Sequence, residues 1–173
     1  MLKDLRMQIE HIKKTDPAAK NIVEILLLYP SIHVLAFYRV AHFFYTIHFF
    51  LLARILSQFA RFLTGIEIHP GATIGKGLFI DHGMGTVIGE TAVIGDRVKL
   101  FHGVTLGGLE NKTGKRHPTV NNDAIIGANA QLLGDITIGE SASVGANAVV
   151  LIDVPAFSIA VGVPAVIKEK KKN

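Results

Sequence analysis

The chain has 173 residues, 49% of them hydrophobic, which suits one compact unit with a helical extension. The absence of cysteine excludes disulfides and thiolate metal sites. A formal charge of +4 includes a lysine-rich run at residues 168–172 that has no aromatic residues, so we expect a solvated tail and no nucleic-acid or membrane site. The chain does not open on a basic and apolar signal sequence, which favours a cytoplasmic protein.

Residues 1–64 have the apolar spacing of helices. In residues 1–15, apolar side chains recur every three or four positions among charges, which predicts an amphipathic helix. Asp16 followed by Pro17 is typical of an N-cap with proline at the first helical position. We therefore expect a second helix from there through Leu28.

The next segment, from Ser31 to Leu63, is apolar enough to raise the question of a membrane span. Ser31 is the expected cap of a helix that continues toward Thr46, and another helix follows to about Leu63. A spanning helix needs about 20 nearly uncharged apolar residues, whereas the run between Arg39 and Arg54 is shorter. We therefore expect packed helices here.

An aliphatic residue returns every six positions for most of the stretch from Ile66 to Val154. These positions are Ile68, Ile74, Ile80, Ile88, Ile94, Leu100, Leu106, Val120, Ile126, Leu132, Ile138, Val144 and Val150. A second, mostly small apolar residue stands two places before most of them, so each unit is a very short strand with two inward residues. Fixed-period repetition is the signature of a solenoid, whose units stack because none can bury its apolar face alone. The spacing predicts a solenoid over residues 65–155 and a tail over residues 156–173.

The six-residue spacing is interrupted twice. Two extra residues enter between Ile80 and Ile88, and eight enter at the loop 107–119. Insertions in a solenoid become loops, and loops on rigid scaffolds often carry function. His82 lies at the first insertion and His117 at the foot of the second, so both are candidate catalytic residues.

Several motifs give the chain a resemblance to the serine O-acetyltransferases. They are IHPGATIG (68–75), DHGMG (81–85), VIGET (87–91), VTLGG (104–108), RHP (116–118) and GVPA (162–165). The hexapeptides alone are shared by many acyltransferases, whereas DHGMG and the TLGG and RHP pair are much more specific. The resemblance covers the repeats and the helices before them from about Asp16. It implies an α+β fold in which the N-terminal α-helical region is followed by a left-handed parallel β-helix of hexapeptide repeats.

The resemblance implies transfer of an acetyl group from acetyl-CoA to the hydroxyl of L-serine, a step of cysteine biosynthesis. Acetyl-CoA would be a co-substrate, with no tightly bound cofactor. The hydroxyl must lose its proton as it attacks the thioester, so the reaction needs a base. By resemblance that base is His82, and its carboxylate partner falls on Glu67, where many members have aspartate. Without cysteine to carry an acyl group, direct attack in a ternary complex is expected.

Substrate contacts are also implied by the resemblance. Arg116 and His117 would hold the serine carboxylate, and His117 also counts among the catalytic residues. The bidentate fork of arginine fits a carboxylate well. Asp16 and Asp81 would hold the serine ammonium group.

The acyl donor and the assembly follow from the same resemblance. Backbone groups near Gly108, Ala128 and Ala146 would meet the pantetheine arm. Members form trimers with sites between neighbouring chains, so we expect a homotrimer in which His82 and Arg116 of one site come from different chains. The tail lacks the terminal isoleucine typical of members that bind O-acetylserine sulfhydrylase, which leaves that partner and tail-dependent inhibition by cysteine open.

Three other functions fit part of the pattern. A hexapeptide acetyltransferase for a sugar or antibiotic hydroxyl would keep His82 but would not need Arg116, Asp16 and Asp81. A γ-type carbonic anhydrase would hold zinc with three histidines, but its expected His-x4-His pair is absent, so we expect no metal site. A non-catalytic scaffold would show no affinity for an acyl-CoA.

Overall fold

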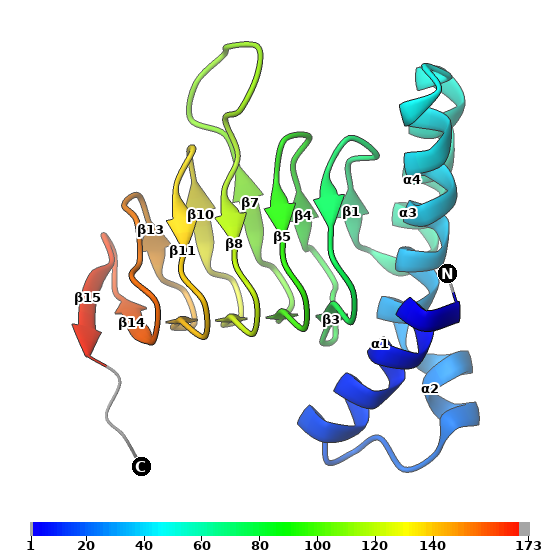
Figure 1. Ribbon diagram of the computed structural model, residues 1–173, viewed down its shortest axis with the longest axis horizontal. Coiled ribbons are helices and arrows are strands. Elements are labelled where there is room, and N and C mark those ends of the chain that lie inside the picture. The colour runs from blue at the N-terminus through cyan, green and yellow to red at the C-terminus, as the bar shows by residue number, and fades with distance from the viewer. Residues whose placement is uncertain (1, 170–173) are drawn as a thin grey trace.

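The computed structural model describes residues 2–169 and places a group of helices at one end of a stack of short strands (Figure 1). The helices are α1 (Leu2–Thr15), α2 (Ile22–Leu28), α3 (Pro30–Thr46) and α4 (Phe50–Thr64). Within residues 2–169 no single helix has the length and apolarity to cross a membrane; α2 and α3 reach them only jointly, across a bend of 62°. Residues 170–172 of the lysine-rich run lie outside the described residues.

Two of the expected helix caps are wrong. Helix α2 begins at Ile22, six residues after Asp16, and its cap is Asn21, whose side chain accepts the N–H of Glu24 at 2.8 Å. Asp16 instead accepts the N–H two residues on, in a turn, where the proline that follows it stands outside any helix. Ser31 lies inside α3, and its hydroxyl accepts the N–H of Ile80 at 2.9 Å. Neither residue therefore caps a helix, because Asp16 closes a local turn and Ser31 accepts from a strand distant in sequence.

Each strand is two to four residues long, and the strands form three sheets, parallel except for the last strand, that wrap around one core. The first sheet contains β1 (Glu67–Ile68), β4 (Val87–Ile88), β7 (Thr105–Gly107), β10 (Gln131–Leu133) and β13 (Val149–Val150). The second contains β2 (Thr73–Ile74), β5 (Val93–Ile94), β8 (Thr119–Val120) and β11 (Thr137–Ile138). The third contains β3 (Phe79–Ile80), β6 (Lys99–Leu100), β9 (Ile125–Ile126), β12 (Ser143–Val144), β14 (Ser158–Val161) and β15 (Val166–Glu169). Successive strands pass from sheet to sheet, so the chain winds as a three-sided parallel coil.

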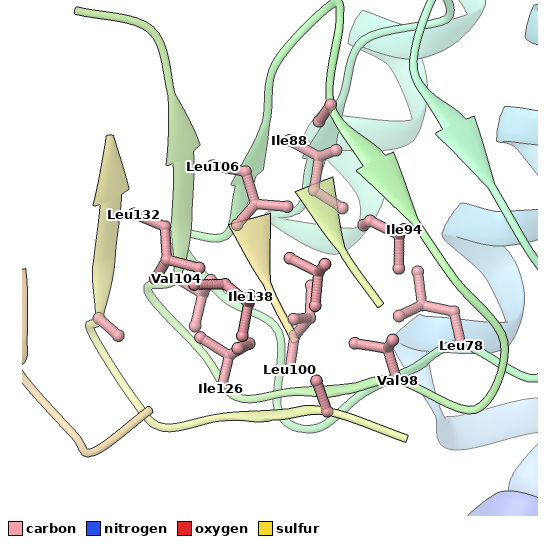
Figure 2. Close-up of a cluster of buried hydrophobic side chains, with 14 of the residues drawn as sticks. Leu78, Ile88, Ile94, Val98, Leu100, Val104, Leu106, Ile126, Leu132 and Ile138 are labelled. Carbon is pink, nitrogen blue, oxygen red and sulfur yellow. The ribbon is translucent and has the colours of Figure 1, made fainter. Parts of the chain in front are cut away.

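Inward aliphatic side chains stack from coil to coil. Ile68 pairs with Ile88 in the ladder, and Leu106 pairs with Leu132. Figure 2 shows these side chains meeting inside the coil, and the labelled ones are Leu78, Ile88, Ile94, Val98, Leu100, Val104, Leu106, Ile126, Leu132 and Ile138, all 2% exposed or less. Burying one such side chain contributes about 1.5–3 kcal/mol, so this column is the main source of stability for strands too short to be stable alone.

Helix α3 covers the open end of the first coil, where no preceding coil pairs with the strand backbone. The hydroxyl of Tyr38 donates to the carbonyl of Ala72 at 2.6 Å, and the guanidinium of Arg39 donates to the carbonyl of Ile74 at 2.8 Å. Phe79 occupies an outward strand position yet is fully buried, because α1, α2 and α3 pack over it. The helices thus protect a sheet edge that would otherwise be exposed.

The six-residue spacing predicted that the repeats end at residue 155, but the last turn of the coil extends further. Strand β14 pairs parallel with β12, and β15 then returns antiparallel along β14. The two strands close the third sheet at the end far from the helices (Figure 1).

Two of the three corners of the coil carry the candidate residues. The His82 corner joins the third sheet to the first, at residues 81–86, 101–104, 127–130 and 145–148. The His117 corner joins the first sheet to the second, at residues 69–72, 89–92, 108–118 and 134–136. The long loop between β7 and β8 projects from the His117 corner beyond the other turns (Figure 1).

Candidate functional site

The two inserted residues change the backbone at the His82 corner. His82 has a φ of 59°, and Gly83 and Gly85 also have positive φ. A non-glycine residue in the left-handed region is uncommon and occurs often at functional sites. Here it directs the imidazole away from the core, leaving the His82 side chain 75% exposed.

His82 shares a cavity with both of the predicted ammonium ligands. Asp16, Asp81 and His82 line a space of about 350 Å³ between the helices and the third sheet. Tyr29 also lines it and donates its hydroxyl to Asp16 Oδ2 at 2.7 Å. This hydrogen bond is the main reason that the pKa of the Asp16 carboxyl lies below its usual value. The cavity therefore offers two carboxylates and a base to one small ligand.

Lys99 was missed by the sequence analysis and holds Asp81 in place. Its ammonium lies 3.0 Å from Asp81 Oδ2 and donates to the carbonyl of Thr15 at 3.2 Å. The ammonium also lies over the rings of Phe79 and Phe101, with distances of 4.8 and 4.6 Å to their centroids. Lys99 is buried although it occupies an outward strand position, and no six-residue pattern marks such a lysine.

Glu67 has a different described partner from the one expected. Its carboxylate pairs with Arg61 of α4 at 2.9 Å. The groups near the His82 ring are Asp81, 3.8 Å from Nε2, and the ring of His102, with 5.9 Å between centroids. The His102 Nδ1 atom is buried and has no hydrogen-bond partner within residues 2–169. A role for Glu67 beside His82 stays a prediction.

Arg116 is held at the other candidate corner by an acidic residue. Its guanidinium donates to Glu90 Oε2 at 2.6 Å, and the hydroxyl of Tyr45 donates to Glu90 Oε1 at 3.0 Å. The hydrogen bond from Arg116 is the main cause that lowers the pKa of the Glu90 carboxyl. Glu90 thus holds the guanidinium of Arg116 at the foot of the long loop, and Tyr45 of α3 holds Glu90.

His117 is buried next to Arg116 and packs against a glycine. An added Cβ at Gly89 would overlap the His117 ring, so only glycine leaves room for the imidazole. Thr91 lies on the other side, with its hydroxyl 2.9 Å from His117 Nδ1. Burial, followed by the charge of Arg116, lowers the pKa of the His117 imidazole. The ring is therefore held in one position and favours its neutral form.

The expected serine ligands form two separate groups. Asp16, Asp81 and His82 meet at the His82 corner, whereas Arg116 and His117 lie at the His117 corner. Within residues 2–169, no hydrogen bond or ion pair links the two groups. The residues expected to bind the carboxylate of serine and those expected to bind its ammonium group therefore lie at different corners of one chain.

The predicted acyl-donor positions are divided in the same way. Ala128 and Ala146 lie on the His82 corner, in successive coils joined by the N–H of Asn147, which donates to the carbonyl of Ala128 at 2.8 Å. Gly108 lies at the start of the long loop on the His117 corner and is exposed. Within residues 2–169, no group of three or more His, Cys, Asp or Glu side chains could hold a metal ion.

Comparison with known proteins gives close relatives. The family described as bacterial transferase hexapeptide (six repeats) matches residues 117–151. The serine acetyltransferase of Helicobacter pylori is 58% identical over 94% of this chain and 95% of its own length. Serine acetyltransferase from Brucella abortus in complex with coenzyme A has a TM-score of 0.95 at 37% identity, covering 99% of this chain and 68% of that one. The Neisseria gonorrhoeae enzyme in complex with serine has a TM-score of 0.93 at 39% identity, covering 96% and 68%.

A three-sided parallel coil of hexapeptides behind a helical region, with a histidine and carboxylate cavity at one corner, is typical of a hexapeptide-repeat acyltransferase. The high identity over nearly the whole length of a curated relative narrows the class further. The chain belongs to the serine acetyltransferase family.

Proposed function

We propose that the chain transfers the acetyl group of acetyl-CoA to the hydroxyl of L-serine, giving O-acetyl-L-serine and CoA. The observation that carries this function is the shared cavity of Asp16, Asp81 and His82, which supplies ammonium ligands beside a base. Solved relatives in complex with serine and with coenzyme A support the two substrates. Neither a simple galactoside nor chloramphenicol carries an ammonium group that needs both carboxylates.

His82 acts as the general base in this proposal. Neutral imidazole removes the proton of the serine hydroxyl while the serine oxygen attacks the thioester carbonyl carbon. The C–S bond then breaks, and the imidazolium returns the proton to the departing thiolate of CoA. A backbone N–H near Gly107 or Gly108 would stabilise the oxyanion between these steps.

The complete acceptor site forms between two chains of a homotrimer. The separation of Arg116 and His117 from His82 by one side of the coil supports this arrangement, because a threefold assembly can bring the two corners of neighbouring chains together. Left-handed winding of the coil is part of the proposal and is supported by the similarity to the solved serine acetyltransferases. Acetyl-CoA would then run along the His82 corner past Ala128 and Ala146, with Gly108 contributed by the neighbour.

A subunit-mixing experiment tests the shared site. Trimers of His82→Ala chains and trimers of Arg116→Ala chains should each be nearly inactive. After joint unfolding and refolding at equal amounts, about a quarter of all sites should hold one intact His82 and one intact Arg116 from adjacent chains. Recovery near that fraction supports the shared site, whereas no recovery places both residues in the same chain's site. Light scattering should give about 56 kDa, three times the 18.7 kDa of one chain.

The role proposed for Glu67 is to orient His82 and stabilise its imidazolium. Glu67→Gln should then lower turnover less than His82→Ala and shift the acid limb of the rate profile to lower pH, because losing an anion disfavours the charged ring. Arg61→Gln is the matched control, since Arg61 is the described partner of Glu67. An unshifted acid limb in Glu67→Gln, or the same shift in Arg61→Gln, would show that Glu67 pairs with Arg61 of α4 and does not act on His82.

The acceptor assay tests the function itself. Thiol release from acetyl-CoA would be measured with L-serine, homoserine, a galactoside and chloramphenicol as separate acceptors. L-serine should give the highest kcat/KM. A higher value with the galactoside or with chloramphenicol would overturn the assignment.

A further inference from the structure

Among residues 2–169, the hydroxyl of Thr91 has one group left to which it can donate. Its oxygen accepts the backbone N–H of Arg116 at 3.0 Å and that of His117 at 3.2 Å. A threonine hydroxyl has two lone pairs and one proton, so these two bonds occupy its acceptor capacity. The remaining proton points to His117 Nδ1, 2.9 Å away.

The backbone of Thr91 gives the same assignment independently. Its N–H donates to His117 Nδ1 at 3.2 Å. A backbone N–H can only donate, so Nδ1 must carry a lone pair and no proton. In a neutral imidazole the proton is then on Nε2.

The Nε2 atom of His117 is free to contact a ligand. Within residues 2–169 it has no hydrogen-bond partner, and it is not among the side-chain atoms that are sealed from solvent without one. Gly89 keeps the ring in place from one side and Thr91 from the other. The lowered pKa of the imidazole, caused first by burial and then by Arg116, agrees with a neutral ring.

We propose that Thr91 is a positioning residue that locks His117 as the neutral Nε2–H tautomer. His117 then donates a hydrogen bond to the carboxylate of the substrate that receives the acetyl group, and it does not act as a base. This inference rests on the proposed function for the identity of the ligand, while the tautomer rests on the hydrogen bonds alone. With its only free nitrogen protonated, His117 has no lone pair for the serine hydroxyl. Of the two candidate histidines, this leaves His82 as the base, and within residues 2–169 no such pair of donors fixes its ring.

The tautomer can be measured directly. Protein labelled with 15N-histidine would be studied at pH 8 by long-range 1H–15N spectroscopy, with His117 signals assigned by their loss in His117→Gln. In the wild type, Nδ1 should resonate as an unprotonated nitrogen and Nε2 as a protonated one. A protonated Nδ1, or intermediate shifts from two exchanging tautomers, would overturn the proposal.

Two variants test whether the hydroxyl is the cause. Thr91→Ser retains the hydroxyl and should keep the wild-type 15N pattern. Thr91→Val has nearly the same shape but leaves Nδ1 only the longer backbone contact at 3.2 Å, so its shifts should move part of the way toward intermediate values. An unchanged pattern in Thr91→Val would show that the hydroxyl does not set the tautomer. The wild-type spectrum and Thr91→Ser keep the proposal falsifiable if Thr91→Val does not fold.

Kinetics then connect the tautomer to substrate binding. Thr91→Val should lower kcat/KM for L-serine by roughly 10- to 100-fold, by analogy with the loss caused by removing the residue that orients a metal-binding histidine, with KM for acetyl-CoA unchanged. Thr91→Ser should recover most of that loss. Equal loss for both substrates would contradict the carboxylate role. Because the spectra do not depend on activity, a protein that shows the expected tautomer but does not acetylate serine would refute only the proposed function.

Discussion

Replacing Gly89 by alanine should disable the site through one methyl group. The backbone of Gly89 has no positive φ, so the substitution brings no backbone strain. The new Cβ would overlap Cδ2 and Nε2 of His117 and would lie 2.8 Å from Cγ. Nonbonded carbon atoms prefer about 3.5–4.0 Å, so the ring must move by more than about 1 Å.

The backbone at Gly89 cannot easily move instead. Its N–H donates to the carbonyl of Leu106 at 3.1 Å, within the ladder between neighbouring coils. A shift of the ring would also disturb the contacts of Nδ1 with Thr91 on its other side, which are 2.9 and 3.2 Å. Misplacing a substrate-positioning group by 1 Å costs about 100-fold in rate, which is the loss that we expect in kcat/KM for L-serine.

The assay is thiol release under varied L-serine at saturating acetyl-CoA, compared with the double variant that also carries His117→Ala. Removing the ring removes the overlap, so Gly89→Ala should cost little in that background. Thermal denaturation should show that Gly89→Ala remains folded, with a destabilisation of about 1–3 kcal/mol from overpacking. The reasoning would be refuted if Gly89→Ala lowered kcat/KM for L-serine equally in the wild type and in His117→Ala. Near wild-type activity of Gly89→Ala would refute it as well.

The remaining predictions concern the base, the carboxylate ligand and stability in acid. His82→Ala should lower kcat by roughly 10²- to 10⁴-fold with an unchanged oligomer by light scattering; a loss below tenfold would assign the base elsewhere. Arg116→Lys keeps the charge but loses the bidentate fork, so KM for L-serine should rise while that for acetyl-CoA stays constant, and an equal rise in both would indicate a damaged loop. Burial is the main cause that lowers the pKa of His11, His69 and His117, so the unfolded chain binds more protons near and below pH 6.5. The urea midpoint should therefore fall as the pH drops from 7.5 to 5.5, and a flat midpoint would contradict the shifts.

The coil could be predicted from the sequence because its information is local and repeated. A buried aliphatic residue at every sixth position has only one way to stay buried, which is to stack on the next unit. The same spacing located the two interruptions, and both His82 and His117 lie at the corners where these interruptions occur. Their roles came from the resemblance of motifs around them, since spacing alone does not separate a catalytic histidine from a surface one.

Helix boundaries between Asp16 and Ser31 depended on the tertiary structure. Both residues have side chains that suit a helix N-terminus, and local propensity gave them that role. In the folded chain, Asp16 accepts from Tyr29, thirteen residues away, and Ser31 accepts from the backbone of β3. A short polar side chain bonds to whichever partner the packed elements bring near, and its neighbours in sequence do not determine that partner.

The repeat spacing, the two interruptions and the positions of His82 and His117 were determined by the sequence itself. Only the tertiary structure showed that Lys99 holds Asp81, that Glu67 pairs with Arg61, and that Thr91 contacts Nδ1 of His117. Each of these contacts joins residues from different coils or from a helix and a coil. Their distances depend on how the coils stack and where the helices dock, so a pattern read along one strand cannot contain them.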